Sequence, residues 1–187
     1  MPDLLISKPE ETEHAPHFSR YIDMVPDGDI LATLAGQIGV TLTELRKIAE
    51  PHSLLRYDPA KWSIREVVGH MIDTERIFAC RALRFARNDR TPLPGFEQDD
   101  YIAAANFDLR PWDDLLDEFY AVRRSNLGMF RGLTEEAWMR RGIANGNEMS
   151  VRAAAYVIAG HERHHLGVIR DRYAIPGKPE TQVGRPN

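Results

Sequence analysis

The feature that most constrains the fold is a helical stripe near the C-terminus that begins with apolar residues and ends with histidines. In the segment from Ser150 to Tyr173, positions three and four residues apart hold Val151, Ala154, Ile158, His161, His165 and Val168. Such spacing is typical of the core-facing side of a bundle helix. Burying two imidazoles is costly unless each ring nitrogen finds a partner. The chain must therefore fold so that another element supplies that partner.

A divalent metal ion would satisfy both histidines at once, because residues four apart lie on the same side of a helix. The alternative is a pair of core histidines that are hydrogen-bonded to neighbouring side chains. We favour the metal, since His161 and His165 have metal-binding spacing and a third histidine is available on another predicted helix. His164 lies off the stripe and is predicted to be a bystander.

A candidate for this third histidine is His70, which lies in a predicted helix with a strong start signal. Ser63 followed by Glu66 forms a capping box, and apolar residues then recur on one face as far as Phe85. His70 falls at the edge of this apolar face, where a ligand that faces a pocket would lie. From its position alone, a histidine on the helix surface fits equally well.

Four segments with helical periodicity predict an all-α fold, a four-helix bundle. They run from about Asp29 to Ala49, from Ser63 to Asn88, from Pro111 to Gly132 and from Ser150 to Tyr173. Before the last helix we expect a short extra helix near Thr134, followed by a turn-rich loop or a short hairpin. The expected organisation is an N-terminal arm (residues 1–26), a helical bundle domain (27–175) and a flexible tail (176–187).

Charge and composition exclude several classes of protein. The net charge of −4 gives no support for nucleic-acid binding. The start of the chain lacks the apolar stretch of a signal peptide, and the longest apolar run, Ala153–Ala159, is too short to cross a membrane. The single cysteine, Cys80, fits a reducing compartment and is expected to be buried. We expect a cytoplasmic protein with no membrane partner.

The predicted helix around His70 is rich in arginine. Between Ser63 and Arg90 there are six arginines and four acidic residues. This excess is compatible with an anionic substrate, but an ordinary solvated helix face is the favoured interpretation.

The segment His161-Glu162-x-x-His165 also matches the helix motif of zinc metalloproteases. We discount this interpretation because no histidine follows His165, and the only later acidic residue downstream of the helix is Glu180. The same segment is similar to half of a di-iron carboxylate site, but that site needs a second Glu-x-x-His, which the chain lacks.

Two motifs together resemble the DinB-like (DinB/YfiT-like) superfamily of metal-binding four-helix bundles. They are Trp62-Ser-x-x-Glu66-x-x-x-His70 and Gly160-His-Glu-x-His-His165; with shorter matches near Tyr21, Asp73 and Arg81, the resemblance covers about residues 20 to 173. It implies a site made of His70, His161 and His165 that holds a divalent metal such as nickel or zinc. It also implies a homodimer. Members of the superfamily include thiol-dependent transferases, isomerases and proteins described as hydrolases.

Three neutral imidazoles would leave the metal an open position. A water held there would act as a nucleophile in a hydrolase, and a thiol held there would be deprotonated in a thiol S-transferase. Both hypotheses involve a small-molecule substrate, the second with a low-molecular-weight thiol. Glu162 and Asp73 are candidate catalytic residues, although each also fits an ordinary helix-surface acid. The alternative is a metal-binding or stress-response binding protein without catalysis.

Overall fold

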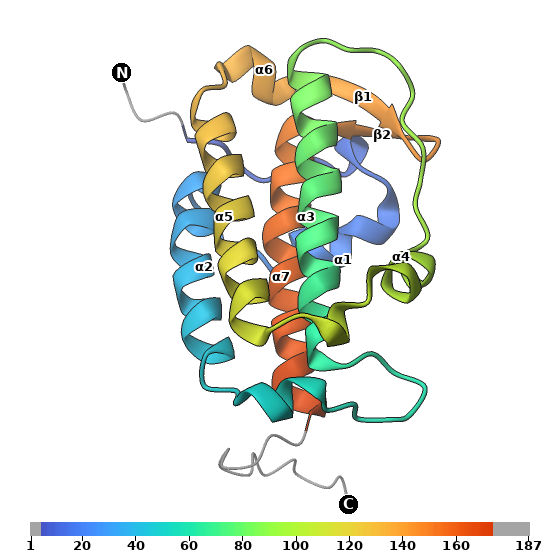
Figure 1. Cartoon of the computed structure of the whole chain (residues 1–187). Helices are drawn as coiled ribbons and strands as arrows, with labels where there is room; N and C mark the ends of the chain where they lie inside the picture. The colour runs from blue at the N-terminus through green and yellow to red at the C-terminus, as the bar shows by residue number, and fades with distance from the viewer. Residues whose placement is uncertain (1–4, 174–187) are drawn as a thin grey trace, which may run out of the picture.

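A computed structural model of the chain describes residues 5–173, and its main body is a four-helix bundle (Figure 1). The long helices are α2 (Ile30–Leu45), α3 (Ile64–Ala86), α5 (Trp112–Arg131) and α7 (Val151–Arg172). Around the bundle, α3 packs between α5 and α7, and α2 packs between the same two helices on the other side. The predicted all-α class is confirmed.

The long helices do not simply alternate in direction. Figure 1 shows that α3 and α5 run the same way, while α2 and α7 run the opposite way. A long crossover therefore joins α3 to α5, and it contains α4 (Gln98–Ala105) and the 3-10 helix η4 (Phe107–Leu109). The crossover returns the chain from one end of the bundle to the other, and α4 lies beside α3.

The remaining elements are short. The N-terminal segment holds η1 (Glu11–Glu13), η2 (Pro16–Phe18) and α1 (Ser19–Ile22), and η3 (Glu50–Leu54) precedes α3. Between α5 and α7 lie α6 (Glu135–Met139) and a hairpin of β1 (Arg141–Ala144) and β2 (Asn147–Ser150). The sequence left open either a turn-rich loop or a short hairpin before the last helix, and the structure has the hairpin. Within residues 5–173, no helix is long and apolar enough to cross a membrane.

Two long helices begin at the capping residues expected for them, and one helix ends earlier than expected. Ser63 caps α3 and forms the predicted capping box with Glu66, and Ser150 caps α7. The helix expected to end at Ala49 ends at Leu45 instead. The next hydrogen bonds span three residues, from the Lys47 and Ile48 amides to the Glu44 and Leu45 carbonyls, so the chain tightens ahead of Pro51.

A buried polar layer divides the apolar core in two. One apolar cluster contains Phe78 and the first half of α7, and the other contains the first half of α3 and the end of α7. Between them lie the buried polar side chains Gln37, His70, Thr74, Glu75, Arg123, His161 and Glu162. All four long helices contribute to this layer, which therefore crosses the middle of the bundle.

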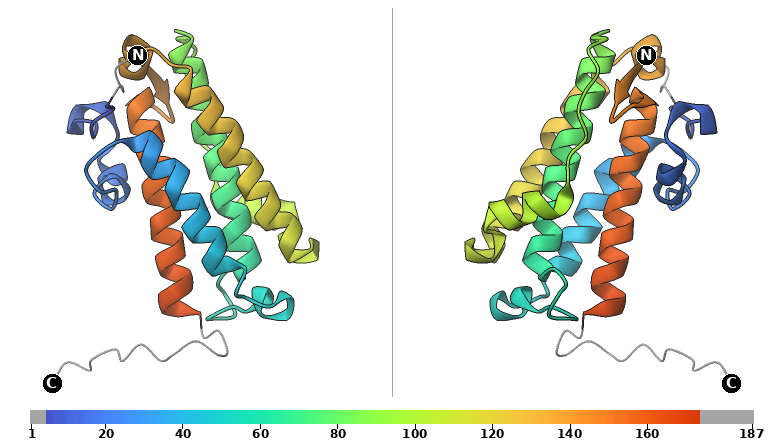
Figure 2. Two further views of the ribbon diagram at one scale, coloured as in Figure 1. Left: turned by 90° about the vertical axis from the view of Figure 1, so that its left-hand side faces the viewer. Right: turned by 90° about the vertical axis from the view of Figure 1, so that its right-hand side faces the viewer.

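Residues 5–29, called the N-terminal segment below, pack along the outer side of α7 (Figure 2). The buried Glu13 forms an ion pair with the partly buried Arg152 of α7, and Tyr21 and Ile22 are buried. The expected bounds of the arm and the bundle domain stay predictions. The expected tail, residues 176–187, lies outside the described residues.

Candidate metal centre

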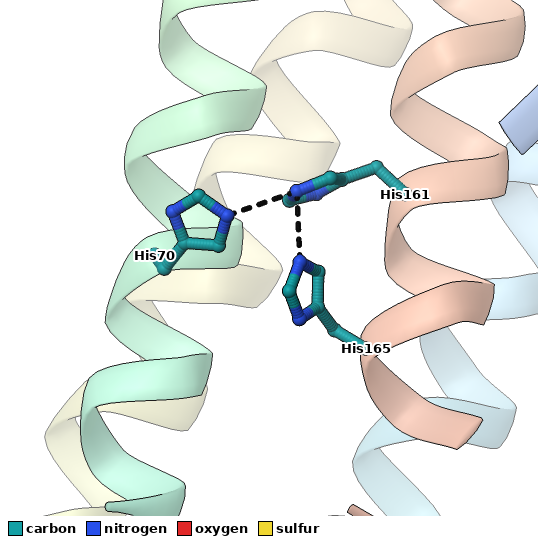
Figure 3. A group of neighbouring side chains, drawn as sticks. All are labelled: His70, His161 and His165. Carbon is teal, nitrogen blue, oxygen red and sulfur yellow. Dashed lines mark hydrogen bonds between the residues drawn. The ribbon is translucent and has the colours of Figure 1, made fainter. Parts of the chain in front are cut away.

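Three histidines from two helices converge in the polar layer. His70 projects from the first half of α3, while His161 and His165 project from neighbouring turns of α7 (Figure 3). The rings of His70 and His161 are buried and that of His165 is partly buried. The structure thus brings together the three residues predicted to be metal ligands.

The convergence involves the Nε2 atoms. His161 Nε2 lies 3.0 Å from His70 Nε2 and 3.0 Å from His165 Nε2. A neutral imidazole nitrogen carries either one N–H or one lone pair, so His161 Nε2 can complete only one of these two contacts as a good hydrogen bond. Two nitrogens bound to one tetrahedral zinc ion at about 2.0–2.1 Å lie about 3.3 Å apart. Both contacts are close to that separation, and all three ligand atoms lie within 4.8 Å of one another. The arrangement therefore fits a divalent ion better than it fits hydrogen bonding alone.

The protonation state of the three rings also suits metal binding. Burial, together with the nearby charge of His164, lowers the pKa of His70 to about 4. Burial lowers the pKa of His161 and His165 well below the ordinary histidine value, and the neighbouring histidines and Arg20 lower it further. All three imidazoles are therefore neutral near pH 7, which is the form that binds metal.

Side chains around the cluster hold the rings in place. The Thr74 hydroxyl lies 3.4 Å from His70 Nδ1, and the Trp62 ring packs 4.9 Å from the His70 ring, centre to centre. The Tyr21 ring lies edge-on to His161 at 5.4 Å, and at the same distance from His164. Tyr21 of the N-terminal segment thus flanks the cluster on one side, and Trp62 flanks it on the other.

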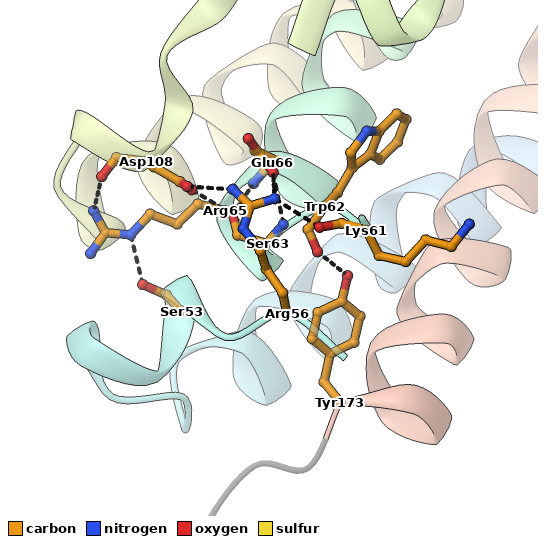
Figure 4. Close-up of polar contacts among 9 residues, drawn as sticks. All are labelled: Ser53, Arg56, Lys61, Trp62, Ser63, Arg65, Glu66, Asp108 and Tyr173. Carbon is orange, nitrogen blue, oxygen red and sulfur yellow. Dashed lines mark hydrogen bonds and ion pairs between the residues drawn. The ribbon is translucent and has the colours of Figure 1, made fainter. Parts of the chain in front are cut away.

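A polar network at the end of the bundle fixes Trp62 and the start of α3 (Figure 4). Tyr173, just after α7, donates its hydroxyl to the Trp62 carbonyl at 2.7 Å. Asp108 of η4 accepts from the Ser63 hydroxyl and from Arg56, and Arg56 also donates to Glu66. This network joins α3, α7 and the crossover, so the position of His70 two turns along α3 is set relative to α7.

Glu162 has a partner away from the three imidazoles. Its carboxylate accepts from Arg123 Nη2 at 2.7 Å, and Arg123 also makes two hydrogen bonds of 2.8 Å to Glu75. All three side chains are buried, with Glu162 2% exposed. The structure therefore gives the acid of the metalloprotease-like motif an ion pair across the core. Its catalytic role stays a prediction.

Asp73 and His164 also lie outside the group of converging ligand atoms. Burial raises the pKa of Asp73, and the charges that act on it come from Arg76, Glu118 and Arg110, on the side of α3 that faces α5. His164 is partly buried between Tyr21 and His165. A catalytic role for Asp73 and the bystander role expected for His164 both stay predictions.

Three residues of the site were missed by the sequence reasoning, namely Arg123, Glu75 and Tyr21 as a ring neighbour of the histidines. Arg123 had a readable signal, since it falls between Phe119 and Leu127 in the apolar stripe of α5. A charged residue at such a position requires a buried counter-charge. Cys80, expected to be buried, is exposed because it lies one turn after Arg76 on the outer face of α3.

Two cavities reach the cluster from different sides. The first cavity, of about 180 Å³, is lined by His70 and His161 together with parts of the N-terminal segment and the hairpin. The second cavity, of about 370 Å³, is lined by His164 and His165 together with Tyr57, Trp62 and Tyr173. Gln98 of α4 lines both cavities. Small molecules can therefore approach the three imidazoles along two routes.

Comparison with known sequences gives one family and one curated relative. The family model of the DinB superfamily matches residues 25–169. A protein of Oceanobacillus iheyensis named "Putative metal-dependent hydrolase OB0413" is 25% identical over 142 residues, which are 75% of this chain and 79% of that protein.

The fold is shared with solved structures, among them YfiT and the mycothiol-dependent maleylpyruvate isomerase. YfiT from Bacillus subtilis, described as a probable metal-dependent hydrolase with an unusual four-helix bundle topology, has a TM-score of 0.64 and 15% identity, over 88% of this chain and 90% of its own. The mycothiol-dependent maleylpyruvate isomerase has a TM-score of 0.62 and 13% identity, over 79% of this chain and 60% of its own. At these identities the likeness concerns the fold alone.

Proposed function

This chain belongs to the DinB superfamily, and from that premise we propose that it is a divalent-metal-dependent enzyme that acts on small molecules. His70, His161 and His165 are the proposed ligands, and nickel or zinc is the proposed metal. The observation that carries the proposal is the convergence of three imidazole nitrogens in the core, with 3.0 Å contacts that hydrogen bonds alone leave incomplete.

The chain's own residues prepare this site for chemistry. Burial keeps the three imidazoles neutral, so each presents a lone pair, and Thr74 and Trp62 hold the His70 ring. The metal, when bound, supplies a Lewis acid that lowers the pKa of a water or a thiol. Trp62 and Tyr21 place aromatic rings beside the imidazoles.

Transfer of a low-molecular-weight thiol onto an electrophile is the reaction that the cavities favour. A two-substrate reaction needs two binding spaces that meet at the reacting atoms, and the first and second cavities reach different histidines of one cluster. Among the described residues, the group of converging ligand atoms contains no carboxylate. A thiol needs no additional base when a metal lowers its pKa, whereas hydrolysis commonly uses one.

Hydrolysis is the second candidate, and its support is the name of the Oceanobacillus relative and the description of YfiT. The single substrate would then occupy one cavity. A metal-binding protein without catalysis is the remaining alternative, and the activity assays below test it. A homodimer is the proposed assembly, and light scattering tests it.

The first experiment measures metal content. Purified wild-type protein, a His161→Ala variant and a His164→Ala variant are analysed by inductively coupled plasma mass spectrometry, with the oligomeric state checked by light scattering. We expect one divalent ion per chain in the wild type and in His164→Ala, and strong loss in His161→Ala. Equal, negligible metal in all three proteins would contradict the proposed function.

The second experiment distinguishes the reactions. Metal-loaded protein is incubated with pairs of thiols and small electrophiles, and separately with ester and amide substrates. Thiol consumption that requires both the electrophile and the metal supports the transferase. Product release without a thiol supports the hydrolase, and no turnover in either assay supports the binding protein.

A further inference from the structure

The first cavity contains an arginine that the proposed chemistry does not use. Arg81 lies three helical turns after His70 on the same face of α3, and its side chain is 5% exposed. Its Nη2 donates to the Pro94 carbonyl at 3.0 Å, and the guanidinium lies over the ring of Phe78 at 4.9 Å and near that of Phe96 at 6.0 Å. A guanidinium has five N–H groups, so most of its donor capacity is available to a ligand.

The other buried arginines have counter-charges. Arg65 pairs with Glu50, and Arg123 pairs with Glu75 and Glu162. Among residues 5–173, no carboxylate pairs with Arg81. A largely buried charge without a counter-charge is costly, because part of its hydration is lost. A bound anion would provide that compensation.

The remaining charges of the first cavity also favour an anion. Arg20 lines it and lies over the Tyr21 ring at 4.7 Å. The one acidic side chain in the lining is Glu148, which is paired with Arg141. The cavity is therefore positively charged, with aromatic walls.

We propose that the first cavity binds a small organic acid, with its carboxylate on Arg81 and its apolar part against Phe78 and Phe96. A planar guanidinium binds a carboxylate through two parallel hydrogen bonds, and the aromatic walls suit a carbon skeleton. The opposite end of the acid lies toward His70 and His161. Its role as the substrate rests on the proposed function, but the binding of a carboxylate at Arg81 is measurable without it.

This assignment revises the favoured interpretation of the arginine-rich helix. Arg76, Arg87 and Arg90 are exposed, as expected of a solvated face. Arg81 differs because it follows His70 by eleven residues, close to three whole helical turns, and so shares the face that is turned toward the cavity.

The test uses benzoate, with neutral benzamide as its uncharged analogue. Binding to the full chain is measured by isothermal titration calorimetry, with the protein loaded with zinc and again after treatment with EDTA. The variants are Arg81→Gln, Arg81→Lys and the matched control Arg87→Gln, an exposed arginine on the same helix. We expect benzoate to bind the wild type more tightly than benzamide, with and without zinc.

Arg81→Gln is expected to weaken benzoate binding by about tenfold or more and to leave benzamide binding unchanged. Arg81→Lys should retain more of the affinity than Arg81→Gln, and Arg87→Gln should retain all of it. No binding of benzoate to the wild type, equal binding of benzamide, or unchanged affinity in Arg81→Gln overturns the proposal. If EDTA abolishes benzoate binding and Arg81→Gln does not weaken it, the metal holds the carboxylate, which overturns the Arg81 site and leaves the proposed metal function intact.

Discussion

Gly160 sets how closely the N-terminal segment approaches the histidine cluster. A Cβ atom at this position would lie 1.9 Å from the Tyr21 carbonyl oxygen. The contacting atom belongs to the backbone, so the whole of α1 would have to shift. The next residue in the chain is the proposed ligand His161, whose ring contacts Tyr21. One missing methyl group therefore allows a helix of the N-terminal segment to cover the candidate metal site.

We predict that Gly160→Ala lowers the free energy of unfolding by about 1–3 kcal/mol, the usual cost of overpacking, less a helix-propensity gain of up to about 1 kcal/mol. Urea denaturation of the metal-free protein measures it. The matched control is Gly36→Ala in α2, where a Cβ meets no atom within 4 Å. That variant should be as stable as the wild type or more so. Equal stability of the two variants would show that Tyr21 does not contact Gly160.

At the scale of elements, the bundle depends on charges that pair between helices. Arg123 of α5 joins Glu75 of α3 and Glu162 of α7, and it also donates to the Leu34 carbonyl of α2 at 3.1 Å. One guanidinium thus links all four long helices at the level of the histidines. Removing it would leave two buried carboxylates without their cation, which is far more costly than replacing the whole group by apolar side chains.

Arg123→Met is predicted to lower the free energy of unfolding by about 3–5 kcal/mol. Arg124→Met is its control, because Arg124 is the next residue and exposed, with a contact to Tyr120 on its own helix. Denaturation is measured in EDTA so that metal loss does not contribute. Similar stability of the two variants would mean that the three buried charges do not stabilise the bundle.

The N-terminal segment is held by a second ion pair, between the buried Glu13 and the partly buried Arg152. Burial raises the pKa of the Glu13 carboxyl, but hydrogen bonds from Arg152, the Glu10 backbone and Ser150 outweigh this effect. The net result is a pKa lowered to about 2. A folded-state pKa below the unfolded value means that the carboxylate stabilises the fold at neutral pH. That contribution is complete above the unfolded pKa of 4.5 and is lost as the pH falls toward 2.

We therefore predict that Glu13→Gln is less stable than the wild type at pH 7, and that the difference shrinks as the pH falls from 4.5 toward 2. Urea denaturation at a series of pH values measures this difference. Glu11→Gln, an exposed residue of the same 3-10 helix, should follow the wild type throughout. A constant difference between Glu13→Gln and wild type over that range would contradict the proposed pairing.

At the scale of the whole molecule, local periodicity and capping predicted the helices well, because those signals lie within a few residues of each other. Ser63 with Glu66 marked the start of α3, and the stripe of α7 marked which side of that helix faces the core. The family resemblance, not the spacing, joined His70 to His161 and His165 across about ninety residues of chain. The structure places their ring nitrogens together.

The parts that could not be predicted depend on long-range packing. The pairing of Glu162 with Arg123 requires knowing that α5 faces α7 at that level, which no pattern within either helix reveals. The approach of Tyr21 to Gly160 requires the path of the N-terminal segment, which has no regular periodicity. Predicting the first cavity would require knowing that the crossover and the hairpin pack around Arg81. Without that knowledge, the sequence favoured a solvated arginine face.

The central claim is that one metal ion lies among three imidazoles in the polar layer of the bundle. A crystal structure of the zinc-loaded protein, with anomalous data collected on either side of the zinc absorption edge, tests it most directly. The account predicts one strong anomalous peak within about 2.0–2.1 Å of the Nε2 atoms of His70, His161 and His165. A zinc-loaded crystal whose anomalous peaks all lie away from these three nitrogens would contradict it.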